Sequence, residues 1–130
     1  MKLAPCPCGG GAYERCCARF HQGMAAPDAL ALMRSRYSAY ALGLFDYLRA
    51  TWHDSTVPAD LGEENGAALK WLGLQVKQHD ADGSRATVEF VARYRIKGRG
   101  QRLHEVSSFV REAGRWYYLD GVPQACQTKV

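Results

Sequence analysis

Apolar residues in the first half of the chain recur with the period of a helix. The steps between them alternate between three and four residues, which places them on one face of an α-helix. These positions are Leu30, Met33, Tyr37, Tyr40 and Leu44. Asp28 stands where an N-cap would stand, and Gly43 stands where the helix would end. The pattern therefore predicts an amphipathic helix that begins after Asp28.

Two further helices are predicted before the pattern changes. Leu44, Phe45, Leu48 and Trp52 suit a short second helix, set at an angle to the first. The residues at 60–63, Asp-Leu-Gly-Glu, have the form of a capping box for a third helix that runs to about residue 71.

The second half of the chain is rich in β-branched and aromatic residues and alternates between apolar and polar positions. Strands are predicted over residues 72–79, 86–96, 103–111 and 116–120, with turns at residues 82–83, 98–100 and 114. Three helices followed by an antiparallel meander predict an α+β fold. In this fold, helices pack on the concave face of a curved four-stranded antiparallel sheet.

The composition is that of an ordinary folded domain. Of the 130 residues, 47% are hydrophobic and 23% are charged, and a chain of this length buries a core without disulfides. Its apolar runs are much shorter than the ~18 residues of a membrane span, and residues 1–5 lack the apolar stretch of a signal peptide. We therefore expect a cytoplasmic protein that makes no membrane contact.

Four of the five cysteines fall within twelve residues. Cys6 and Cys8 flank a proline, and Cys16 and Cys17 follow a Gly-rich turn. Zinc binds four soft ligands in a tetrahedron, and a reducing cytoplasm favours a metal site over disulfides. Disulfides and free buried thiols are the alternatives. His21, four residues beyond Cys17, is a reserve ligand in place of one thiolate.

A zinc ion with four protein ligands has no position left for water, so the predicted centre is structural and not catalytic. We place the domain boundaries accordingly. Residues 1–26 form a zinc knuckle, residues 27–122 form the α+β domain, and residues 123–130 form a polar tail. Cys126 lies in that tail and has no assigned role.

The order of the motifs resembles a known family over nearly the whole chain. Residues 6–17, Cys-Pro-Cys-Gly-Gly-Gly-Ala-Tyr-Glu-Arg-Cys-Cys, resemble the SEC-C motif, the zinc module at the C-terminus of the translocase ATPase SecA. Segments at residues 33–37, 51–53, 71–74, 90–93 and 116–121 resemble the YchJ family, also called UPF0225. The resemblance implies a zinc knuckle and a nuclear-transport-factor-2-like domain, a cone of curved sheet capped by helices. It implies no specific task, because the family has no established biochemical function.

Two features depart from the family's pattern. The run between Cys8 and Cys16 is one residue shorter than the motif usually has, which gives more weight to His21 as a ligand. Many relatives also end in a second SEC-C motif, whereas this sequence has only Cys126 in that region. A second zinc is therefore not expected.

Alternate residues of the third and fourth predicted strands share a face of the sheet and could line a cavity inside the cone. The candidate cavity residues are Arg36, Tyr37, His53, Glu105, Ser107, Phe109, Trp116, Tyr118 and Asp120. Related cones sometimes hold an acid–base pair, as in ketosteroid isomerase, and Asp120, Glu105 and His53 would then be the candidate bases. We favour the alternative that bulky aromatic side chains fill a closed core, and we assign no catalytic residue.

Basic residues gather in one stretch, although the net charge is only +4. The stretch contains no acid and consists of Arg93, Arg95, Lys97, Arg99 and Arg102 with their uncharged neighbours. A solvated hairpin tip is the simpler interpretation. Contact with phosphate, as on RNA or a ribosome, is the weaker one, because no aromatic platform or nucleic-acid-binding motif accompanies the charge.

The leading hypothesis for function is a non-enzymatic, zinc-containing binding protein. The similar module of SecA recruits the chaperone SecB and contacts the ribosome, so the resemblance implies a ribosomal or chaperone partner for the knuckle. The alternative is a small-molecule-binding protein or enzyme that uses the cone. A redox role for Cys16 and Cys17 ranks last, because adjacent cysteines form only a strained disulfide ring. A filled cone would favour the first hypothesis, and an open cavity with a perturbed carboxyl would favour the second.

Overall fold

The computed structural model describes residues 4–59 and 69–124 of the chain. Its sheet has four antiparallel strands in sequence order: β1 (Leu69–Asp82), β2 (Arg85–Ile96), β3 (Arg99–Glu112) and β4 (Arg115–Pro123). The predicted α+β fold and meander are confirmed. Each strand extends beyond its predicted stretch, because backbone pairing continues past the residues whose side chains alternate.

Two of the strand connections are two-residue turns with positive φ at both central positions. These residues are Lys97 (52°) with Gly98 (78°), and Ala113 (52°) with Gly114 (79°). Turns of this kind match the right-handed twist of the strands that they join. The turn predicted at residues 98–100 is therefore placed one residue too late, because the β2–β3 hairpin turns at Lys97 and Gly98.

The helical elements precede the sheet. They are η1 (Tyr13–Arg15), a single 3-10 turn, α1 (Ala18–His21), α2 (Ala29–Leu42) and α3 (Phe45–Ala50). Asp28 caps α2, because its side chain accepts a hydrogen bond from the backbone N–H of Ala31 at 2.7 Å. Gly43 ends the helix with a φ of 74°. Both predicted caps and the short helix after Gly43 are confirmed.

The helix predicted over residues 60–71 is wrong at its end. Its capping box falls in residues 60–68, which lie outside the described residues, whereas Trp71 belongs to β1 and lies opposite Tyr94. The register between β1 and β2 shifts just after this pair, between Trp71 and Gly73. Such an irregularity interrupts the alternation of side chains, so the start of the strand lacks the pattern that would identify it.

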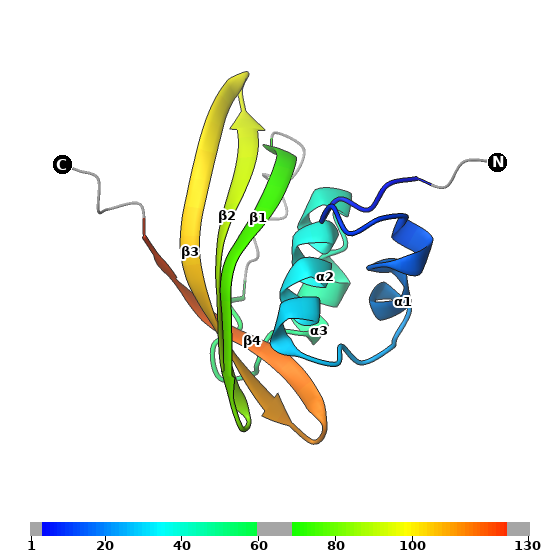
Figure 1. Ribbon diagram of the computed structural model, residues 1–130, viewed down its shortest axis with the longest axis vertical. Helices are drawn as coiled ribbons and strands as arrows, with labels where there is room; N and C mark the ends of the chain where they lie inside the picture. Colours follow the sequence, from blue (N-terminus) through cyan, green and yellow to red (C-terminus); the bar gives the residue numbers. More distant parts are fainter. Residues whose placement is uncertain (1–3, 60–68, 125–130) are drawn as a thin grey trace.

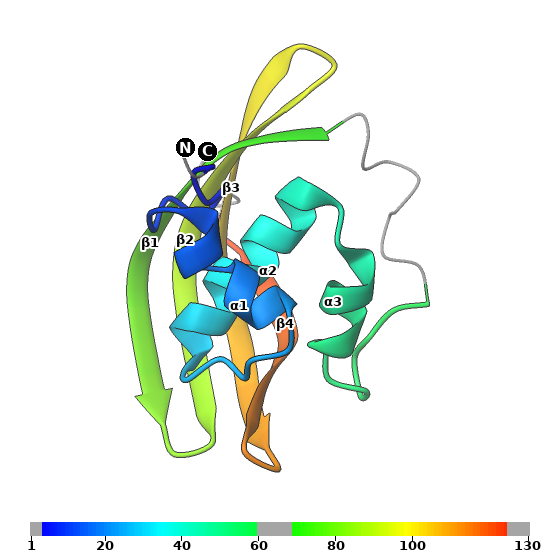
Figure 2. The ribbon, with the colours of Figure 1, turned by 90° about the vertical axis from the view of Figure 1, so that its right-hand side faces the viewer.

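The helices cover the concave face of the sheet, and α2 lies between the sheet and the N-terminal segment (Figures 1 and 2). Residues of α2 are consequently buried on more than one side. They include Ser35 and Ser38, which are both 0% exposed, and Arg36, which is 5% exposed. The single apolar stripe predicted for this helix was therefore incomplete, because the cysteine-containing segment covers a second side.

One apolar cluster connects these layers. It contains Leu32, Met33 and Tyr37 from α2, Val88, Phe90 and Phe109 from the sheet, and Cys6, Cys8 and Cys17 from the N-terminal segment. Three of the cysteines thus pack in the same apolar cluster as α2 and the sheet, and the boundary placed after residue 26 stays a prediction. Within residues 4–59 and 69–124, no helix is long and apolar enough to cross a membrane.

Candidate metal centre and candidate cavity

The four N-terminal cysteines converge on one point. All four Sγ atoms lie within 4.8 Å of one another. The Sγ atoms of Cys8 and Cys16 are 3.5 Å apart, those of Cys8 and Cys17 are 3.7 Å apart, and those of Cys16 and Cys17 are 3.9 Å apart. A tetrahedron of thiolates with Zn–S bonds of ~2.3 Å has edges of ~3.8 Å. The arrangement therefore fits a tetrahedral metal, and the predicted four-cysteine cluster is confirmed as a group able to hold one.

Glycines allow the chain to bring these thiols together. Cys6 donates its backbone N–H to the carbonyl of Gly11 at 2.7 Å, which closes a tight loop around the Gly-rich turn. Gly9 and Gly11 have φ values of 86° and 117°. A Cβ on Gly10 would lie 2.9 Å from Cys16 Sγ and 3.3 Å from Cys8 Sγ. Any side chain at this position would therefore crowd the ligands.

Helix α2 holds the other side of the cluster. The Ser38 hydroxyl lies 3.3 Å from Cys17 Sγ, to which it donates, and 3.4 Å from Cys6 Sγ. Arg34 Nη1 donates to the carbonyl of Cys8 at 3.1 Å. The hydrogen bond from Cys17 is the largest of the effects that lower the pKa of Cys8 to about 4. The cluster thus stabilises one thiolate from its own contacts, and a bound metal would deprotonate the other thiols.

His21, the reserve ligand, lies outside this cluster. Its Nε2 donates to the carbonyl of Ser35 at 2.8 Å, so its Nδ1 accepts from the hydroxyl of Tyr13 at 2.6 Å. Both ring nitrogens therefore have partners other than the thiols. Burial lowers the pKa of His21, in keeping with a neutral ring in this position.

These contacts predict opposite results for two substitutions. We expect Cys17→Ser to lose most of the bound metal, because a hydroxyl replaces a thiolate ligand. We expect His21→Ala to retain one metal per chain and to lose about 1 kcal/mol or more of stability, because its hydrogen bonds disappear. Elemental analysis of both purified variants measures this. A metal-free His21→Ala variant that remains folded would identify His21 as a ligand.

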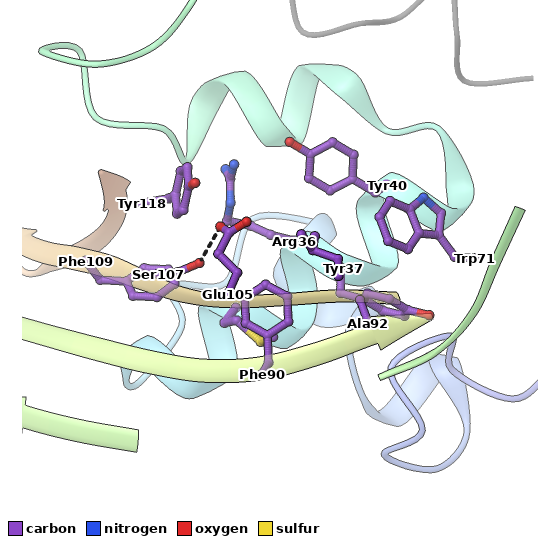
Figure 3. A pocket seen from close by; sticks show the side chains of 12 residues that line it. Arg36, Tyr37, Tyr40, Trp71, Phe90, Ala92, Glu105, Ser107, Phe109 and Tyr118 are labelled. Atoms are coloured by element: carbon purple, nitrogen blue, oxygen red, sulfur yellow. Dashed lines mark hydrogen bonds between the residues drawn. The ribbon is translucent and has the colours of Figure 1, made fainter. Parts of the chain in front are cut away.

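A cavity of about 280 Å³ lies between α2 and the concave face of the sheet. At ~30 Å³ for each molecule of liquid water, this is room for about nine waters. Its lining residues are Met33, Arg36, Tyr37, Tyr40, Trp71, Phe90, Ala92, Leu103, Glu105, Ser107, Phe109 and Tyr118 (Figure 3). The expectation that aromatic side chains fill the cone is therefore wrong. The rings form walls around a space because they come from separate layers.

Six of the predicted cavity residues line this space, and three do not. The lining ones are Arg36, Tyr37, Glu105, Ser107, Phe109 and Tyr118. His53 instead has its Nε2 2.9 Å from Glu112 Oε2, and Trp116 lines a different hollow beside Phe20. Asp120 is exposed and lies opposite Ser108.

A bulge in β4 explains the error for Asp120. Phe109 pairs with Tyr118, but Ser108 pairs with Asp120, so Leu119 is an extra residue in the ladder. The bulge reverses the alternation, and Tyr118 and Asp120 point to opposite faces. Six lining residues were not predicted: Met33, Tyr40, Trp71, Phe90, Ala92 and Leu103. Tyr40 lay on the predicted apolar face of the helix, which was the available signal, whereas Trp71 had been assigned to a helix.

Arg36 is the most unusual residue of the cavity. Although it is charged, it is only 5% exposed. Its Nη1 donates to the carbonyl of Leu48 and to the hydroxyl of Thr51, both at 2.8 Å. Its guanidinium carbon lies 4.9 Å from the ring centre of Trp52 and 4.4 Å from that of Tyr118. Among the described residues, no carboxylate forms an ion pair with it.

Glu105 projects into the same cavity from β3 (Figure 3). Its carboxyl accepts a hydrogen bond from the hydroxyl of Ser107 at 3.2 Å. Burial is the main cause that raises the pKa of Glu105, and the charge of Asp120 adds to it. The carboxyl lies against Gly121, where a Cβ would overlap it. A glycine in β4 thus makes room for this carboxyl.

The basic stretch lies at the exposed end of the β2–β3 hairpin. Arg93 faces Arg102 directly across the two strands, and Arg95 faces Lys70 across β1 and β2. All four side chains are exposed. This placement agrees with a solvated hairpin tip, and contact with phosphate stays a prediction.

Known proteins are similar to this chain over most of its length. A family described as "YchJ, middle NTF2-like domain" matches residues 28–121. This chain belongs to the YchJ family. The UPF0225 protein of Cupriavidus metallidurans is 59% identical over 126 residues, which cover 91% of this chain and 88% of that protein. UPF0225 protein RSc0270 of Ralstonia nicotianae is 57% identical over 130 residues, which cover 91% and 90%.

Solved structures extend the likeness to the cysteine segment. The solution structure of a SEC-C motif containing protein from Rhodopseudomonas palustris has a TM-score of 0.83 and 39% identity, and covers 91% of this chain and 97% of that one. The crystal structure of a SEC-C motif containing protein from Psychrobacter arcticus has a TM-score of 0.77 and 28% identity, and covers 92% of this chain and 81% of that one. In this member of the YchJ family, four of the five segments that carry the family resemblance contribute to the cavity wall. They supply Met33, Arg36, Tyr37, Trp71, Phe90, Ala92 and Tyr118.

Proposed function

We propose that this protein binds a small molecule in the cavity between α2 and the sheet. The observation that carries the proposal is Arg36, a buried cation on the cavity wall that no described carboxylate neutralises. Moving a charged side chain out of water costs several kcal/mol unless a partner of opposite charge or good hydrogen bonds offset it. Such a cost is typical of a binding site and unusual in a purely structural core.

The cavity also has the two features that distinguish a binding site from a closed core. It is open space surrounded by rings, and it contains a carboxyl, that of Glu105, whose pKa is raised by burial. Apolar walls with a few convergent polar groups are the usual composition of ligand pockets. These observations favour the small-molecule hypothesis over the one in which the cone is only a scaffold. The predicted ribosomal or chaperone partner of the knuckle stays a prediction.

We further propose that the metal of the four-cysteine centre is zinc and that its role is structural. The four thiols fit a tetrahedral ion, and four protein ligands leave no open coordination position for water or a substrate. Cys6, Cys8, Cys16 and Cys17 would hold the ion, which would fix the N-terminal segment against α2. Helix α2 contacts the centre through Arg34 and Ser38, and the same helix carries Arg36.

A cavity-filling substitution tests the binding proposal. Ala92 is 1% exposed and lines the cavity, so Ala92→Leu should occupy part of the space and weaken binding at least tenfold, at a cost of about 1–3 kcal/mol in stability. The probe is p-cresol, a small neutral phenol, and the readout is the NMR shift of the Met33 methyl group. Ala81→Leu is the matched control, because Ala81 is exposed on β1.

The expected result is a saturable shift of the Met33 methyl in the wild type and in Ala81→Leu, and a much weaker one in Ala92→Leu. Small molecules released by heat from the purified protein provide a second readout, by mass spectrometry. If p-cresol, benzoate and benzamide all leave the Met33 methyl unmoved and no small molecule is released, the cavity is not a binding site.

A further inference from the structure

We propose that the cavity takes a small carboxylate with a flat apolar body, and that the guanidinium of Arg36 is the receptor for its carboxylate. This inference rests on the proposed small-molecule function and names the chemical class of the ligand. It draws on the donors of Arg36, on the charge balance of the cavity and on the arrangement of its polar and apolar walls.

The guanidinium of Arg36 is held in place with part of its hydrogen-bonding capacity free. Nη1 is used by the carbonyl of Leu48 and the hydroxyl of Thr51, which fix the orientation of the planar group. The hydroxyl of Tyr40, on the same helix, is a further hydrogen-bond partner of the guanidinium. Among the described residues, neither Nε nor Nη2 has a carboxylate or backbone carbonyl acceptor. Arg36 and Tyr40 both line the cavity, so a ligand there would compete with the Tyr40 hydroxyl for these donors.

Two parallel N–H donors in a fixed plane match the two oxygens of a carboxylate. Nε and Nη2 of an arginine form such a fork. The rings of Trp52 and Tyr118 lie close to the guanidinium and restrict its tilt, at 4.9 and 4.4 Å from its carbon. A receptor that is oriented before binding loses little side-chain entropy when the ligand arrives.

The charge balance of the cavity favours an anion. Arg36 comes from α2 and Glu105 comes from β3, and both project into the space without pairing (Figure 3). Glu105 faces Arg36 and Tyr40 on α2, Ser107 on its own strand and Tyr118 on β4. Asp120 lies on the opposite face of β4 and acts on Glu105 only through its charge. The neighbouring residue on β2, Phe90, carries no charge. Arg36 is thus a cation on the cavity wall without an ion-pair partner among the described residues, and the carboxylate of a ligand would supply one.

The walls separate into a polar and an apolar end along β3. Ser107 and Glu105 lie toward Tyr118 and Arg36 (Figure 3). Leu103 lies two residues before Glu105 on the strand, opposite Ala92. Trp71 lies at the same end as Ala92, whereas Phe90 lies directly opposite Glu105 (Figure 3). Flat rings make up much of this wall, and the volume of about 280 Å³ suits a body of the size of one aromatic ring.

Matched probes test the inference, with benzoate as the carboxylate and benzamide as its neutral isostere. We expect benzoate to bind the full-length, metal-loaded protein roughly ten- to a hundredfold more tightly than benzamide, because charge-assisted hydrogen bonds are stronger than neutral ones. Arg36→Met should remove this preference while leaving the weak affinity for benzamide largely unchanged. Calorimetric titration and the shift of the Met33 methyl measure both affinities.

Two further variants make the test specific. Arg36→Lys retains the positive charge but lacks the two parallel N–H donors, so it should keep only part of the preference for benzoate over benzamide. It also takes the place of Arg36→Met in the test if that variant does not fold. Glu105→Gln should retain benzoate binding and remove its pH dependence. In the wild type, binding should weaken as the pH rises through the pKa of Glu105, because the ionised carboxyl repels the ligand.

The outcomes separate the two proposals. Equal affinity for benzoate and benzamide, or a preference that survives in Arg36→Met, would overturn the carboxylate inference and leave the small-molecule function standing. Failure of benzoate to bind while p-cresol binds would have the same meaning. Failure of all three probes would overturn both proposals.

Discussion

Removal of the metal by a chelator should unfold the N-terminal segment and weaken α2, while the sheet stays folded. The segment at residues 4–26 has few apolar side chains apart from its cysteines, and four thiols without a metal cannot all be thiolates at one point. Metal binding contributes about 10–16 kcal/mol to the folding of zinc-finger peptides, so its loss removes the main stabilising interaction of such a segment.

Amide hydrogen exchange measures this result residue by residue. We expect amides in residues 4–26 to exchange freely after chelation, and amides of α2 near Ser38 to lose part of their protection. Amides in β2 and β3 should remain protected and serve as the internal control. Unchanged protection of the N-terminal segment would show that it folds without metal. Loss of protection throughout the sheet would show that the boundary placed after residue 26 does not separate two folding units.

The substitution Phe109→Ala should cost about 3–5 kcal/mol of unfolding free energy, the usual range for a buried phenylalanine. Phe109 is 1% exposed, lines the cavity and packs against the ring of Tyr118 with centres 5.7 Å apart. Its removal would join new empty volume to an existing cavity, so little of the space can be closed by relaxation of the neighbours.

Urea unfolding measures the cost, with a lower midpoint and an unchanged m-value as the expected signature. Phe45→Ala is the matched control, because Phe45 lies on α3 and is only partly buried. We expect its cost to be less than half that of Phe109→Ala. A cost for Phe109→Ala below about 1 kcal/mol would mean that this ring does not stabilise the cavity wall.

The elements that could be predicted from the sequence are those with strong local signals. Asp28 and Gly43 bound α2 because a cap acts on backbone groups only a few residues away. The four cysteines could be assigned to one site because they lie within twelve residues of one another in the sequence. In each case, the residues that determine the feature are close in sequence.

The features that could not be predicted depend on contacts between distant segments. The bulge at Leu119 follows from the pairing of β4 with β3, and it reverses the face of Asp120. The partners of His21 come from Tyr13 and from the backbone of α2, so its spacing from Cys17 gave no sign of them. The cavity itself depends on how far α2 stands from the sheet, which no local pattern encodes.

Helix α2 contacts the metal centre through Ser38 and the cavity through Arg36, only two positions earlier. Any free energy by which one bound species alters this helix is therefore felt by the other. Thermodynamic linkage is reciprocal, so a cavity ligand that raises the affinity for metal by some factor has its own affinity raised by the same factor. A dissociation constant for the cavity thus has a defined meaning only at a stated metal occupancy.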